Sequence, residues 1–255
     1  MKLLFSIQIK CNSPFNLGDL VHIHGHPASG KTHLLYYLLA TCTLPTTQGW
    51  DKAAIIFDMD GKFNISRFKQ LLVNRLKSSE PIMPIVERCL KNMHIFRPTS
   101  SDQLAVTLAH LPKYHAKHFP DIALGMVAIH SVDAFYWLDR FKAEQLRLAN
   151  LPHSSLQNIS SILEALRLSL GSVVVLTDWG LVQRQANVSH NNHPHEAQDN
   201  NHPKDLPLIH QITLSLVDAD SDDRHTLGVI NVSGRPGTRS FTLRIQPNDL
   251  FVDAL

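Results

Sequence analysis

The chain has 255 residues, a length that suits one α/β domain with a substantial hydrophobic core. Its formal net charge of +2 at pH 7 is too small for a dedicated polyanion-binding protein, so any nucleic-acid contact must come from local loops. Three widely spaced cysteines without a CxxC pair predict reduced thiols and a cytosolic or nuclear location: Cys11, Cys42 and Cys89.

Strand and helix patterns alternate along the first two-thirds of the chain. Residues 1–19 predict a short lead-in strand, and no apolar segment is long enough for a signal-peptide core or a membrane span. Strand patterns then occupy 20–24, 53–60, 94–98, 122–130 and 171–179. Helical patterns occupy 33–44, 64–77, 101–115 and 154–170. This alternation predicts an α/β fold with a mostly parallel sheet flanked by helices, whose strand carboxyl ends gather at one edge.

The composition changes after residue 182. Residues 183–207 are polar, rich in Asn and His and without periodicity, which predicts a long mobile loop. Alternating segments at 208–218, 225–234 and 238–246, with the tight turn SGRPGT between the last two, predict an antiparallel β-meander. No internal repeat or second domain is evident, so residues 20–255 are predicted to form one core.

Residues 25–32, GHPASGKT, have the GxxxxGKT spacing of a phosphate-binding loop. Glycines let backbone N–H groups approach phosphate oxygens, the lysine would reach the β- and γ-phosphates, and the threonine hydroxyl would ligate Mg²⁺. A strand pattern before the loop and an apolar helix pattern after it favour this reading over a glycine turn with an accidental Lys-Thr. The predicted binding site for ATP and Mg²⁺ comprises Gly25, His26, Pro27, Ala28, Ser29, Gly30, Lys31 and Thr32.

Four segments together resemble the RecA-like recombinase paralogues of eukaryotes, with the X-ray repair cross-complementing subgroup as the nearest. They are GDLVHIHGHPASGKTHLLYYLLATCTLP, IIFDMDGKF, VDAFYWLDR and GVINVSGRPGTRSFTLRI, and the resemblance covers most of residues 17–247. It implies a RecA-like P-loop ATPase core. Because the chain begins almost at this core, we expect it to lack the family's N-terminal helical domain and linker, and to end an assembly instead of propagating a filament.

The resemblance also assigns roles to particular side chains. Asp60 stands where recombinases carry the glutamate that activates water, and it is one methylene shorter. The metal-orienting aspartate is replaced by His130, and the polar sensor after the last parallel strand by Asp178 and Trp179. Asp133 could compensate as a metal ligand. Two alternatives stay open, namely that His130 is only a packed strand-end histidine and that Asp58 and Asp60 are only capping or turn residues.

These substitutions predict that ATP is bound and hydrolysed slowly, if at all. Neutral imidazole is a poor ligand for Mg²⁺, which prefers oxygen. The protein would then be an accessory paralogue in homologous recombination and double-strand break repair, working in the nucleus within a complex of other paralogues. The alternatives are an active DNA-dependent ATPase and a P-loop small-molecule kinase.

The cations available for single-stranded or branched DNA are few, which predicts weak, salt-sensitive binding that belongs mainly to the complex. They fall in two predicted loops, at about 139–152 and 180–207, and beside the tail turn: Lys142, Arg147, Arg184, Lys204, Arg235 and Arg239. The apolar segment AFYWLD favours core packing or a partner surface over base stacking. A histidine cluster could bind a metal or be low-complexity loop: His190, His193, His195 and His202.

Overall fold

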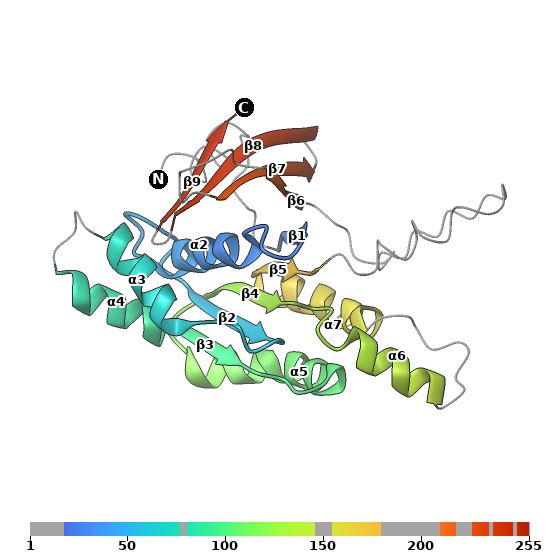
Figure 1. Cartoon of the computed structure of the whole chain (residues 1–255). Helices are drawn as coiled ribbons and strands as arrows, with labels where there is room; N and C mark the ends of the chain where they lie inside the picture. The colour runs from blue at the N-terminus through green and yellow to red at the C-terminus, as the bar shows by residue number, and fades with distance from the viewer. Residues whose placement is uncertain are drawn as a thin grey trace.

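The structure is a computed structural model in which the chain forms one nine-stranded sheet with helices on both faces (Figure 1). It describes residues 18–76, 81–145, 155–179, 210–217, 226–234, 237–246 and 249–254. The strands lie in the order β3-β2-β4-β5-β1-β6-β7-β8-β9. The predicted fold class, an α/β fold of the RecA-like type, is confirmed.

Six neighbouring strands are parallel, and their carboxyl ends therefore meet at one edge. In sheet order they are β3 (Met93–Phe96), β2 (Ala53–Asp58), β4 (Leu124–His130), β5 (Val173–Thr177), β1 (Leu20–Gly25) and β6 (His210–Val217). The central strands are apolar and fully buried, as expected when helices cover both faces of a sheet.

Three antiparallel strands complete the sheet beyond β6. They are β7 (Thr226–Gly234), β8 (Gly237–Gln246) and β9 (Asp249–Ala254). The predicted C-terminal meander is therefore present, with one difference. Its first strand, β6, pairs in parallel with β1 on one side and antiparallel with β7 on the other, so β6 joins the two halves of the sheet.

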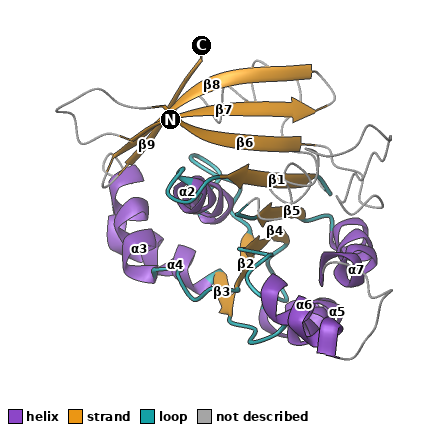
Figure 2. Cartoon of the chain, turned by 45° about the vertical axis from the view of Figure 1, so that its right-hand side comes forward, coloured by secondary structure: helices purple, strands orange, loops and turns teal. Residues whose placement is uncertain are grey.

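Two hydrophobic cores lie on opposite faces of the parallel strands (Figure 2). One face packs against α2 (Lys31–Thr43), α3 (Ile65–Arg75) and α4 (Ile82–Lys91), and the other against α5 (Ser101–His118) and α7 (Ser155–Leu170). Successive residues of β2 alternate between these cores, since Ala54 and Ile56 belong to the first and Ile55 and Phe57 to the second.

Side-chain caps fix where two of the helices begin. The Asn64 side chain accepts a hydrogen bond from the Arg67 N–H at 3.0 Å, at the start of α3. The Ser100 hydroxyl accepts one from the Gln103 N–H at 3.1 Å, at the start of α5. Each cap satisfies a backbone donor that the first turn of a helix leaves without an intrahelical partner.

The structure corrects the sequence-based prediction at one loop and adds two elements to it. The predicted DNA-facing loop at 139–152 is wrong in its first part, where α6 (Tyr136–Gln145) is helical and supported by an Arg140–Glu144 ion pair at 3.0 Å. Helix α4 and strand β9 were not predicted. The predicted lead-in strand lies almost entirely in residues 1–17, which are outside the described residues. The predicted loop at 183–207 lies wholly outside them.

None of the described helices combines the length and apolarity that crossing a membrane requires.

Candidate functional site

The segment between β1 and α2 forms a tight loop whose shape depends on its two glycines. A Cβ on Gly25 would lie 2.5 Å from the Ser29 Oγ and 2.6 Å from the Leu214 carbonyl oxygen, so no larger residue fits there. Gly30, the N-cap of α2, has φ 94° in the left-handed region, which glycine adopts at little cost. The loop thus takes the compact form that its spacing predicts.

Lys31 is the first residue of α2 and is almost completely buried. Its ammonium group donates hydrogen bonds to the carbonyl oxygens of Gly25 at 2.6 Å and His26 at 2.7 Å. Burial lowers the pKa of Lys31, while the carboxylates of Asp178 and Asp133 act in the opposite direction. No side chain caps the N-terminus of α2. A buried lysine, an uncapped helix N-terminus and a glycine loop together form an environment suited to an anion.

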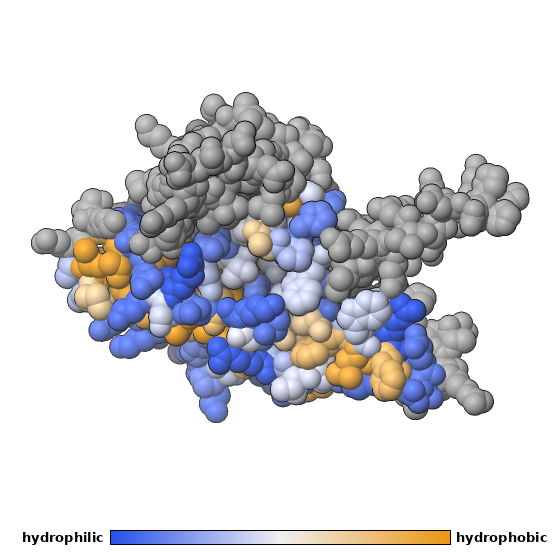
Figure 3. All heavy atoms as spheres, viewed as in Figure 1, coloured by the Kyte–Doolittle hydropathy of each residue, from blue (hydrophilic) through white to orange (hydrophobic). Residues whose placement is uncertain are grey.

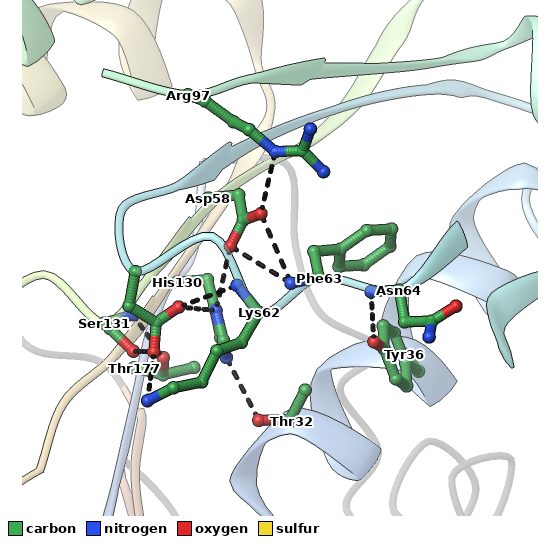
Figure 4. Close-up of polar contacts among 11 residues, drawn as sticks. Thr32, Tyr36, Asp58, Lys62, Phe63, Asn64, Arg97, His130, Ser131 and Thr177 are labelled. Atoms are coloured by element: carbon green, nitrogen blue, oxygen red, sulfur yellow. Dashed lines mark hydrogen bonds and ion pairs between the residues drawn. The ribbon is translucent and has the colours of Figure 1, made fainter. Parts of the chain in front are cut away.

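Thr32 points from α2 toward the carboxyl end of β4, where His130 lies (Figure 4). The Thr32 Oγ1 and the His130 Nε2 are 3.0 Å apart and form a hydrogen bond. The other ring nitrogen, Nδ1, makes ion-pair contacts with Asp60 Oδ1 at 3.1 Å and Asp58 Oδ1 at 3.6 Å, without the alignment of a hydrogen bond. The imidazole therefore lies between the loop threonine and two strand-end carboxylates.

Asp58, at the end of β2, is buried and held by protein donors on both oxygens. The Phe63 N–H donates to both Asp58 oxygens at 3.2 Å, and the Arg97 Nε donates to Oδ2 at 3.2 Å. This geometry agrees with the alternative that Asp58 stabilises a turn after the strand.

Asp60 accepts a hydrogen bond from the Ser131 hydroxyl at 3.0 Å and pairs with the Lys62 ammonium at 3.0 Å. Burial alone would raise the pKa of Asp60, but His130, Lys62 and Ser131 together hold that pKa well below its ordinary value. A carboxylate with a strongly lowered pKa is a weak general base. The role of Asp60 in water activation stays a prediction, which this environment does not favour.

A second pair of carboxylates lies beyond the ends of β4 and β5. Asp133 is buried, with Oδ2 accepting a hydrogen bond from the Trp179 N–H at 2.9 Å and Oδ1 without a hydrogen-bond partner among the described residues. Burial raises the pKa of Asp133 to about 6, and the nearby Asp178 contributes to the increase. Asp133 is thus oriented toward a backbone donor, and its role as a metal ligand stays untested.

Asp178 contacts two histidines of β1 that the sequence analysis did not identify. The His22 Nε2 and the His24 Nδ1 lie 2.8 Å and 3.0 Å from its carboxylate oxygens. Burial alone would raise the pKa of Asp178, but the hydrogen bonds to both histidines hold it well below its ordinary value. The i, i+2 spacing of His22 and His24 was the sequence signal that could have placed them together, because residues two apart on a strand lie on the same face.

The residues present do not fit the magnesium site that a P-loop ATPase implies. Mg²⁺ requires near-octahedral oxygen coordination at about 2.0–2.1 Å and usually retains several waters. Here the side chain at the end of β4 is the imidazole of His130, and it is hydrogen-bonded to the Thr32 hydroxyl that would otherwise bind the metal. Both neighbouring carboxylates, on Asp58 and Asp60, are engaged by arginine, lysine and other protein donors.

Most of the predicted DNA contacts and the whole histidine cluster fall outside the described residues. Arg184, Lys204, Arg235 and the four histidines of 190–202 lie outside the described residues. Arg239 lies in β8, paired with Val232 of β7. These roles stay predictions.

Helix α6 carries an exposed apolar surface, which Figure 3 shows as a largely hydrophobic patch over this helix. Trp137, Leu138 and Phe141 are 56%, 44% and 57% exposed, and α6 has no buried residue. The segment AFYWLD is therefore divided: Ala134 and Phe135 are partly buried and pack against the second core, whereas Trp137 and Leu138 face outward, where the alternative of a partner surface remains. Contiguous apolar side chains on a protein surface often mark an interaction site.

Known proteins with similar sequences include two that are named for DNA repair. DNA repair protein XRCC2 of Mus musculus is 32% identical over 169 residues, which are 66% of this chain and 58% of that protein. A DNA repair protein XRCC2 homolog of Arabidopsis thaliana is 26% identical over 211 residues, which are 68% of this chain and 57% of that protein. The chain therefore spans less than two-thirds of the length of these relatives. No protein-family model matches it.

Proposed function

Since the chain is a homologue of the XRCC2 proteins, which are RecA-like, we propose that it is a nucleotide-binding accessory subunit that acts in DNA repair by homologous recombination. It would work in the nucleus within a complex of recombinase paralogues. ATP would serve there as a structural ligand or a switch, with slow hydrolysis or none.

The observation that carries this proposal is the phosphate loop at the carboxyl edge of the parallel sheet. Lys31 is held along the loop by the carbonyls of Gly25 and His26, within reach of an anion bound at the start of α2. Ligands of open α/β sheets bind at this edge, and helix N-termini favour phosphate groups. Bound at concentrations 100 to 1,000 times its dissociation constant, ATP would stabilise the folded state by about 2.7–4.1 kcal/mol.

Slow hydrolysis follows from the surroundings of the loop. Phosphoryl transfer in this class needs Mg²⁺ held by the loop hydroxyl and a strand-end carboxylate, together with a group that orients water. Thr32 is bonded to His130, and Asp60 is a weak base because its pKa is strongly lowered. The loss of one well-placed transition-state group costs about 10²–10³ in rate.

The exposed face of α6 supports a role within a complex. Its aromatic and aliphatic side chains are the kind found at the centre of protein interfaces, where Trp and Phe are enriched. Recombinase paralogues are the partners we propose for this surface. DNA would be bound chiefly by the complex, because the chain has few clustered cations.

The test is ATP binding and single-turnover hydrolysis by the wild type and Lys31→Ala. Binding should raise the melting temperature of the wild type, and Lys31→Ala should abolish that increase. Lys113→Ala, which removes an exposed lysine of α5 on the opposite face of the sheet, is the matched control and should bind ATP normally.

Three outcomes would contradict the proposal. Equal ATP binding by Lys31→Ala and the wild type would exclude the loop as the site. Rapid turnover stimulated by single-stranded DNA would instead support the active ATPase. Phosphate transfer to a nucleoside or a sugar would support the kinase.

A further inference from the structure

The phosphate loop and the strand ends beside it differ from a magnesium-nucleotide site in a consistent way. The Thr32 hydroxyl, which would bind the metal, lies 3.0 Å from the His130 Nε2. The His130 side chain is only 4% exposed, and its other nitrogen faces Asp60 and Asp58. A metal at this position would have to displace a buried side chain that has polar partners on both sides of its ring.

The charge of a metal is also already supplied by the protein. Asp58 pairs with Arg97 at 3.2 Å and Asp60 pairs with Lys62 at 3.0 Å, so two carboxylates are matched by two cationic side chains. Displacing a paired cation from a buried carboxylate carries a substantial cost, because the carboxylate then lacks its partner.

Lys62 is placed to act on the nucleotide as well as on Asp60. Its ammonium group lies 4.5 Å from the centre of the Trp179 ring, and its side chain is 62% exposed. Lys62 also lies close enough to Lys31 for its charge to contribute to lowering the pKa of Lys31, after the larger effect of burial. The two lysines therefore share the edge of the sheet at which the phosphates would lie.

We propose that this site binds the triphosphate of a nucleotide without a divalent metal, with His130 in the metal position and Lys62 as a second phosphate-contacting cation. The inference rests on the proposed function, because it concerns the same loop. Lys62, on the exposed loop after β2, would bridge Asp60 and the phosphates when ATP binds, because an ammonium group has three donors. The Ser131 hydroxyl and His130 would remain on Asp60.

The experiment compares the dissociation constant of ATP in Mg²⁺, in Mn²⁺ and in EDTA. The wild type should bind with the same affinity in all three, within about threefold. Binding at least tenfold tighter in either metal would overturn the inference, and Mn²⁺ is included as a second divalent ion that favours oxygen ligands, as Mg²⁺ does. Absence of binding in every buffer would refute the proposed function itself, and the inference with it.

Variants locate the effect. His130→Asp restores a strand-end carboxylate and should bind ATP at least tenfold tighter in Mg²⁺ than in EDTA, whereas His130→Asn should show no such difference. Lys62→Ala should weaken binding in EDTA about ten- to hundredfold, the range of one charged hydrogen bond. Lys69→Ala, an exposed lysine of α3, is its matched control.

A third carboxylate beside Asp58 and Asp60 could prevent His130→Asp from folding. In that case the affinities of the wild type for ATP in Mg²⁺, Mn²⁺ and EDTA still test the inference. Unchanged affinity of Lys62→Ala in EDTA would overturn the role of Lys62.

Discussion

Replacing Asp133 with asparagine should stabilise the protein more at neutral pH than at mildly acidic pH. Asp133 is buried, with one oxygen bonded to the Trp179 N–H and the other without a hydrogen-bond partner among the described residues. Burial raises its pKa from an ordinary value of 3.8 to about 6. At neutral pH the folded protein therefore contains an ionised carboxylate in an environment that favours the neutral acid.

The sign of the pH dependence follows from this raised pKa. The folded state binds the Asp133 proton more tightly than the unfolded state does, so this group adds stability at low pH. That contribution is complete below the unfolded pKa and is lost as the pH rises through about 6. Each pH unit between these limits is worth about 1.4 kcal/mol, so the wild type should lose about 1.4 kcal/mol from this group between about pH 5 and about pH 7.

Asparagine has nearly the same shape as aspartate, its carbonyl can accept the same Trp179 hydrogen bond, and it carries no charge. The gain in free energy of unfolding for Asp133→Asn should therefore be about 1.4 kcal/mol larger at about pH 7 than at about pH 5. The difference between variant and wild type is the quantity to compare, because the histidines of the chain also titrate in this range.

Urea unfolding followed by circular dichroism at both pH values measures this difference. Asp121→Asn is the matched control, because it removes an exposed carboxylate and reports what loss of a surface charge does over the same range. An equal effect of Asp133→Asn at both pH values would refute the argument that burial of this carboxylate is costly.

Two further predictions concern stability and thiol chemistry. Ser100→Ala should lower the free energy of unfolding by about 1 kcal/mol, because it removes the cap of α5, whereas Ser100→Asp should retain most of it; equal losses would refute the capping role. Cys42 and Cys89 should resist iodoacetamide until the protein unfolds, since burial raises the pKa of both thiols. Mass spectrometry of the peptides measures this, and labelling of the native protein would contradict it.

Hydrophobic periodicity was enough to predict the parallel sheet, because each buried strand is a continuous apolar run bounded by polar residues. Helix α4 was missed because Pro81 and Pro84 suggest a break. Both lie where proline is tolerated, one at the N-cap and one in the first turn. Strand β9 was missed because a short alternating segment shows its pairing only once β8 is in place.

The candidate site was predictable where it depends on neighbours in sequence, and not where it depends on strand order. The phosphate loop and His130 at the end of β4 follow from local patterns. The pairing of Asp58 with Arg97 requires β3 to lie beside β2, which no spacing in the sequence indicates. The contact of His22 with Asp178 likewise depends on the pairing of β1 with β5.

The position of β6 links the C-terminal strands to the proposed nucleotide site. Its Leu214 carbonyl lies against Gly25, so closely that a single added methyl group would not fit between them. A partner that displaces β6 would therefore change the shape of the phosphate loop, and a nucleotide in the loop would resist that displacement. Thermodynamic reciprocity makes the two effects equal, so a partner that tightens ATP binding through these strands is itself held more tightly by the ATP-bound protein, by the same factor.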